Sequence, residues 1–211
     1  MRGPRTLITH RTGCLDDFWV LDATSIVWAR VTGSGRTGAP SPRQGPGLAW
    51  ASGALWLYGG TYQGTSLSDL YLFNATTLEW TNVGSDVLGS PPIPRSDFSF
   101  VALNGALYLF GGRGPKDKPT PGKERCAKLR PPWLILLSPI WCGIRNDMHK
   151  FEVGGREWTP INPEGTVEWP AARQGAYLAA GDDGMLYLFG GDIGIQYIFF
   201  IGGDSPTGWS G

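Results

Sequence analysis

The side chains most often used in catalysis and metal binding are few and scattered along this sequence. There are two histidines, His10 and His149, and three cysteines, Cys14, Cys126 and Cys142. The cysteine number is odd and no CxxC spacing occurs, so neither a disulfide framework nor a zinc site is implied. His149 stands inside a strand-like stretch, where we expect it to serve as a packing residue. We therefore predict no catalysis, no bound metal and no other cofactor.

Three arginines recur at a regular spacing and have the chemistry to bind an anionic ligand. Arg43 and Arg95 are 52 residues apart, and Arg173 follows 78 residues later. A guanidinium group binds a carboxylate through two parallel hydrogen bonds, so a ring of such groups could bind carboxylates. The alternative is a structural role, in which each arginine binds backbone carbonyls or an acidic residue of the next repeat. The sequence leaves both interpretations open.

The spacing of the arginines belongs to an internal repeat. The hexapeptide LYLFGG occupies 107–112 and again 186–191, and the similar LWLYGG occupies 55–60. Trp28 and Trp80 are also 52 residues apart. Several landmarks in one register indicate an array of repeated units rather than a single active site.

Each repeat has the pattern of four short strands. In the first complete repeat these are expected at 43–52, 54–58, 69–73 and 78–83, and the second of them is continuously apolar, as in a strand buried on both faces. The pair Gly59-Gly60 ends that strand, because glycine tolerates positive φ and close backbone approach. Four strands alone cannot bury both faces, whereas units packed side by side can.

The order of these motifs resembles the kelch repeat of β-propellers. Its pattern of Pro-Arg, an apolar strand ending in Gly-Gly, an aspartate and a tryptophan is found at 42–80 and 94–158, and in part at 172–191 and 16–28. The resemblance implies an all-β, kelch-type β-propeller that is incomplete, with about three blades of four antiparallel strands. Propellers close with about four to eight blades.

This pattern divides the chain into units. We expect a disordered leader at 1–15, a half-blade at 16–31 and a blade at 43–83. A second blade at 95–161 contains an insertion at 113–145, and it is followed by another half-blade at 173–191 and a degenerate or non-native tail at 192–211.

The repeated side chains have roles that the resemblance implies. The tryptophans should lie on outer strands and pack between neighbouring blades, and the aromatic residues of the second strands should do the same. The aspartates should accept backbone N–H groups in the turn before the third strand. These residues are Trp28, Trp80 and Trp158; Tyr58, Tyr108, Phe110, Tyr187 and Phe189; and Asp17, Asp69 and Asp147.

The insertion at 113–145 differs from the rest of the chain. It holds eight basic and two acidic residues and then a short apolar run. Three interpretations are open. It is a partner-docking segment anchored by Trp133, Leu134 and Trp141, a basic and apolar membrane-surface segment, or non-native sequence such as a retained intron.

The function implied by the resemblance is a protein–protein interaction scaffold without catalysis of its own. The partner would be another protein, through an acidic peptide motif, and the open propeller faces favour self-association. The alternative is part of a kelch-type enzyme, an oxidase, epimerase or metal-dependent specifier protein, whose catalytic residues lie in missing blades.

The chain has 18 basic and 18 acidic residues, so nucleic acid is not an expected partner. No apolar run reaches the ~20 residues of a membrane span, and without a signal-peptide pattern we expect a cytoplasmic protein.

Overall fold

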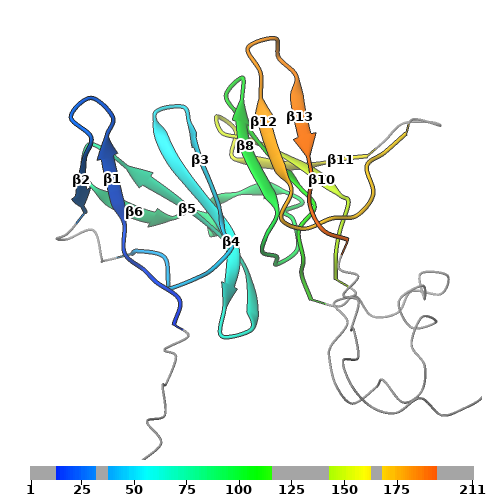
Figure 1. Ribbon diagram of the computed structural model, residues 1–211, viewed down its shortest axis with the longest axis horizontal. Coiled ribbons are helices and arrows are strands. Elements are labelled where there is room, and N and C mark those ends of the chain that lie inside the picture. Colours follow the sequence, from blue (N-terminus) through cyan, green and yellow to red (C-terminus); the bar gives the residue numbers. More distant parts are fainter. Residues whose placement is uncertain (1–12, 32–37, 116–142, 163–167, 194–211) are drawn as a thin grey trace, which may run out of the picture.

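The computed structural model describes residues 13–31, 38–115, 143–162 and 168–193, and these form an all-β structure (Figure 1). The 3-10 turn Gly84–Asp86 lies in the connection between two of its strands. They are β1 (Trp19–Asp22), β2 (Val27–Arg30), β3 (Gly47–Ala51), β4 (Ala54–Tyr62), β5 (Thr65–Asn74), β6 (Glu79–Asn82), β7 (Leu88–Gly89), β8 (Ser99–Leu103), β9 (Ala106–Phe110), β10 (Met148–Glu152), β11 (Glu157–Ile161), β12 (Tyr177–Ala180) and β13 (Leu186–Phe189).

The strands group into two full blades between two hairpins. The first blade is the antiparallel meander β3-β4-β5-β6, and the second is β8-β9-β10-β11 with β7 added parallel to β11. The hairpins are β1-β2 before the first blade and β12-β13 after the second. The predicted all-β, partial kelch-type propeller is therefore confirmed.

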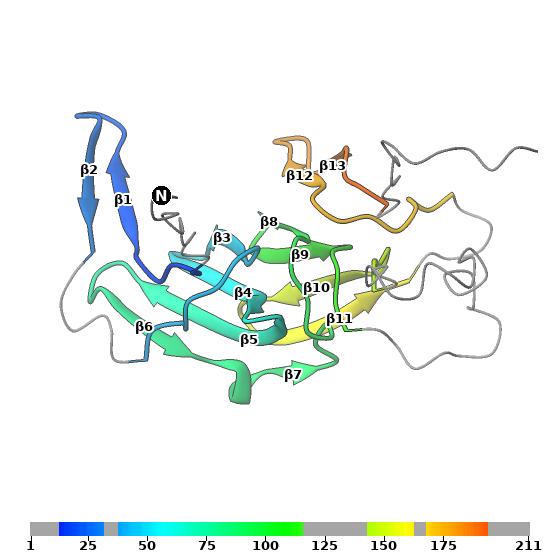
Figure 2. The same ribbon diagram turned by 60° about the horizontal axis from the view of Figure 1, so that its bottom comes forward.

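The blades lie side by side through their inner strands, with β3 next to β8 and β8 next to β12 (Figures 1 and 2). The second strand of each full blade is hydrogen-bonded to the residue that precedes the first strand of the next unit. The Gly60 amide donates to the Arg95 carbonyl, and the Gly112 amide donates to the Arg173 carbonyl, both at 2.8 Å. Both glycines have positive φ, which explains the repeated glycine pair at this position.

The core lies between the two full blades. Trp158 of β11 is 1% exposed, and its ring centroid lies 5.2 Å from that of Tyr58 in the preceding blade. Trp80 of β6 packs on Phe18, the residue before β1, with ring centroids 5.5 Å apart. These contacts confirm that the two tryptophans pack between neighbouring units.

The same prediction is wrong for the outermost aromatic residues. Trp28 is 62% exposed, Tyr187 55% and Phe189 80%. They lie on the hairpins β1-β2 and β12-β13, where the described residues include no further unit to cover them. Their burial depends on a neighbour, not on their own repeat.

The insertion leaves and re-enters the second blade at one point. The Gly114 amide donates to the Gly143 carbonyl at 3.0 Å, and the Arg145 amide donates to the Gly112 carbonyl at 3.0 Å. A Cβ on Gly143 would lie 2.2 Å from the Gly114 carbonyl oxygen, so this position requires glycine. The blade thus keeps the register of β9 and β10 on either side of the insertion.

Candidate functional site

The three repeated arginines each stand just before the inner strand of a blade and turn back into it. Each Nε donates to the carbonyl two residues earlier, and each Nη1 donates to the carbonyl of the first glycine in the Gly-Gly pair. The acceptors are Ser41 and Gly59 for Arg43, Ile93 and Gly111 for Arg95, and Ala171 and Gly190 for Arg173, all at 2.8–3.1 Å.

In the two full blades an aspartate completes this arrangement. Arg43 binds both carboxylate oxygens of Asp69 at 2.7 and 2.9 Å. Arg95, which is fully buried, binds those of Asp147 at 2.7 and 2.8 Å. Such two-point ion pairs orient the guanidinium and fix the blade locally.

Two details of the sequence interpretation are wrong. Each acid belongs to the arginine's own blade, not to the next, because the first and third strands of the meander run in the same direction and start from the same end of the blade. Asp69 and Asp147 accept from guanidinium groups instead of capping a turn. Since a carboxylate beside a buried guanidinium compensates its charge, this pairing is favoured over bonds to backbone amides.

The electrostatics of Asp147 reflect this setting. Burial opposes its ionisation, but hydrogen bonds from Arg95 and from His149 outweigh that effect and hold the pKa of Asp147 well below its usual range. His149 Nε2 lies 3.2 Å from Asp147 Oδ2. The His149 ring also packs edge-on against Trp158, so its predicted packing role is confirmed and a polar contact is added.

Arg173 differs from the other two arginines. It is only half-buried, and none of the described residues supplies a carboxylate to it or an acceptor to its Nη2. Its two carbonyl bonds nonetheless hold the guanidinium as in the full blades. A ligand role for Arg43, Arg95 and Arg173 stays a prediction, and Arg173 is the arginine whose outer edge is open to a carboxylate.

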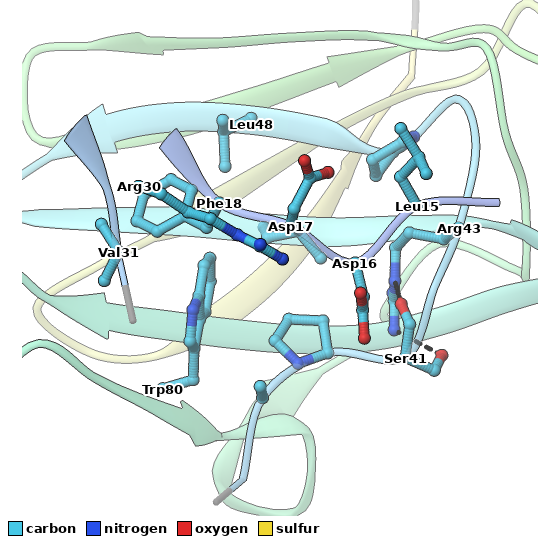
Figure 3. Close-up of a pocket in the computed structure, with 14 residues that line it drawn as sticks. Leu15, Asp16, Asp17, Phe18, Arg30, Val31, Ser41, Arg43, Leu48 and Trp80 are labelled. Atoms are coloured by element: carbon cyan, nitrogen blue, oxygen red, sulfur yellow. Dashed lines mark hydrogen bonds between the residues drawn. The ribbon is translucent and has the colours of Figure 1, made fainter. Parts of the chain in front are cut away.

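A cavity of about 430 Å³ lies between the first hairpin and the first blade (Figure 3). Phe18, Val31 and Trp80 are among its apolar lining residues. Asp16, Asp17, Arg30, Ser41 and Arg43 add polar groups. We did not predict this cavity from the sequence; the signal was the first half-blade, of which the described residues include only the third and fourth strands.

The structure does not test the docking site predicted in the insertion. Trp133, Leu134 and Trp141 lie outside the described residues, so their docking role stays a prediction. Within the described ranges, no three histidine, cysteine, aspartate or glutamate side chains gather closely enough to hold a metal ion. In the same part of the chain, no helix has the length and apolar character needed to cross a membrane.

Comparison with known proteins agrees with the strand order and the blade contacts. A family model described as the KLHDC2/KLHL20/DRC7 Kelch-repeats domain matches residues 8–112. This chain is a kelch-repeat protein.

Its curated relatives are larger proteins. This kelch-repeat protein is 26% identical over 187 residues to Kelch domain-containing protein 2 of Bos taurus, covering 87% of the chain and 37% of the relative. It is 26% identical over 206 residues to Kelch domain-containing protein 1 of Homo sapiens, covering 93% and 48%. It is 28% identical over 158 residues to Rho GTPase-activating protein gacHH of Dictyostelium discoideum, covering 74% and 9%. The chain thus spans less than half of each of these relatives.

Proposed function

We propose that this kelch-repeat protein is a protein-interaction module that receives an acidic residue of a partner at Arg173. The observation that carries the proposal is the difference between Arg173 and its two equivalents. All three guanidinium groups have the same two carbonyl bonds, but only Arg43 and Arg95 have a carboxylate partner among the described residues. An oriented guanidinium with an open edge matches a carboxylate in two-point geometry.

The surroundings of Arg173 favour a protein partner over a small anion. Beside it, β13 is the last strand of its sheet, and among the described residues its outer edge is unpaired. Phe189 and Tyr187 expose large apolar rings on this hairpin. An extended segment can pair with the edge strand, cover the rings and place an acidic side chain on Arg173. A cytoplasmic setting, as predicted from the sequence, is part of this proposal.

The test is a selection of random peptides on the purified 211-residue chain at nanomolar concentration. We expect the selected peptides to share an acidic residue next to alternating apolar residues. Replacing Arg173 by Ala should weaken their binding at least tenfold, since a hydrogen-bonded charge pair contributes about 1.5–3 kcal/mol.

Arg156→Ala is the matched control, because Arg156 lies on the second blade and has only a 3.8 Å contact with Asp86. It should leave peptide binding unchanged. Peptides without an acidic residue, or equal binding to the Arg173→Ala and Arg156→Ala variants, would overturn the proposal.

A further inference from the structure

The two hairpins are opposite halves of one blade. β12-β13 repeats the first and second strands, since LYLFGG of β13 is also the sequence of β9 and its glycine pair. β1-β2 repeats the third and fourth strands, and the bond that closes this hairpin is the same as in a full blade. The Val31 amide donates to the Phe18 carbonyl at 2.9 Å, as the Val83 amide donates to the Leu70 carbonyl at 2.9 Å.

The arginine–aspartate pair is divided between these halves. Arg173, on the C-terminal half, has no carboxylate among the described residues. Asp17, on the N-terminal half, stands 52 residues before Asp69 and is its counterpart in the repeat. The exposed carboxylate of Asp17 accepts the indole N–H of Trp19 at 2.7 Å. Among the described residues of its own half, it contacts no guanidinium group. Each half therefore carries the member of the pair that the other lacks.

The cavity beside the first blade corresponds to the interface between the two full blades, but it lacks the side chain that fills that interface. Phe18, Val31 and Trp80 line the cavity. Their counterparts at the interface of the two full blades are Leu70, Val83 and Trp158, which are all 1–2% exposed. There the space is filled from the second strand, where Tyr58 packs on Trp158.

The C-terminal half has the side chain for that space. Phe189 is the counterpart of Tyr58 and is 80% exposed. The glycine that follows is also uncovered: a Cβ on Gly59 or Gly111 would meet the arginine carbonyl of the next unit at 2.8 or 2.6 Å, whereas a Cβ on Gly190 meets nothing within 4 Å. Among the described residues, the surface around Phe189 and Gly190 thus lacks the neighbour that its equivalents have.

We propose that a second copy of this chain is that neighbour. β13 of one copy pairs with β1 of the other, and Asp17 of the second copy binds Arg173. The described residues of each copy supply three blades, so two copies supply six, within the range of ~4–8 blades in which propellers close. This inference rests on the proposed role of Arg173 as a carboxylate receptor and names the partner.

The repeat fixes the register of the new strand pair. In the full blades Leu55 lies opposite Phe73, and Leu107 lies opposite Phe151. The equivalent pair is Leu186 of one copy opposite Leu21 of the other, which places Phe189 opposite Phe18 and next to the cavity. A two-fold axis repeats the same contact on the other side, so both open edges are paired in the ring.

Light scattering with size exclusion on the 211-residue chain tests the proposal. We expect twice the chain mass of 22.8 kDa at micromolar concentration. Asp17→Arg should give a monomer, because it places a second guanidinium against Arg173, and Arg173→Asp should give a monomer because it places two carboxylates together. An equimolar mixture of the two variants should form a heterodimer, because one of its two contacts then has the wild-type arginine–aspartate pair and the other has the same pair in reversed order.

A second pair of variants tests the apolar contact without the charges. Phe189→Asp should also give a monomer. Ile26→Asp is the matched control and should stay dimeric, because Ile26 is exposed in the β1-β2 turn and its counterpart Leu78 remains 45% exposed in a full blade. Circular dichroism melting confirms that each variant is folded.

A wild-type monomer at 100 μM, or a dimer that survives both charge variants, would overturn the pairing of copies. If the wild-type chain is monomeric but binds acidic peptides through Arg173, the proposed function stands and only the second copy is wrong. If it is dimeric but the charge variants have no effect, the copies associate through another surface and the second-copy proposal is wrong, while the peptide selection still decides whether Arg173 receives a carboxylate.

Discussion

At the scale of single residues, the three arginines form a graded series. Arg95 is fully buried with a two-point ion pair, Arg43 is almost as buried with the same pair, and Arg173 is half-buried with carbonyl bonds alone. Arg95→Met should lower the free energy of unfolding by about 3 kcal/mol or more, since it leaves Asp147 without its charge partner. Arg173→Met should cost about 1 kcal/mol. Urea unfolding in the monomeric Asp17→Arg background measures both, and equal costs would contradict the series.

The residue scale also determines a pH dependence. Because the folded-state pKa of Asp147 lies below its usual value of 3.8, its ionisation stabilises the fold above about pH 4. That contribution is lost as the pH falls below the unfolded-state pKa toward the folded-state one. The stability difference between wild type and Asp147→Asn should therefore shrink from pH 6 to pH 2.5. Urea midpoints measure it, with the exposed Asp182→Asn as control; a constant difference would exclude this role of the charge.

At the scale of the elements, the insertion is closed by its own stem. The bonds from Gly114 to Gly143 and from Arg145 to Gly112 hold both ends on the second blade. Replacing residues 116–142 with Asn-Gly should leave the blade intact and change the free energy of unfolding by less than about 2 kcal/mol, because shortening a loop has only a logarithmic effect on closure entropy. Calorimetry and urea unfolding test this. Loss of folding would show that the insertion contributes to the core.

At the scale of the whole molecule, ring closure by two copies would couple folding to association. The melting temperature should then rise by several degrees between 1 and 100 μM chain, because dilution favours the separate and less stable copies. Asp17→Arg should melt at one temperature over that range. Differential scanning fluorimetry gives both curves, and a wild-type curve independent of concentration would argue against a closed ring.

The sequence by itself determined the repeat, the strand positions and the family pattern, since these depend on local features. The apolar run at the start of β4, the glycine pair, which interrupts the register of β4 instead of ending the strand as predicted, and the tryptophan of β6 act through neighbouring residues and through rules of backbone geometry. The tertiary structure alone decided which distant groups meet. Arg95 and Asp147 are 52 residues apart and pair because β8 and β10 start from the same end of the blade. Trp158 is buried while Trp28 is exposed because only Trp158 has a described blade to pack on. Burial and ion pairing depend on the neighbouring unit, and a repeat looks the same in sequence whether or not that unit is present.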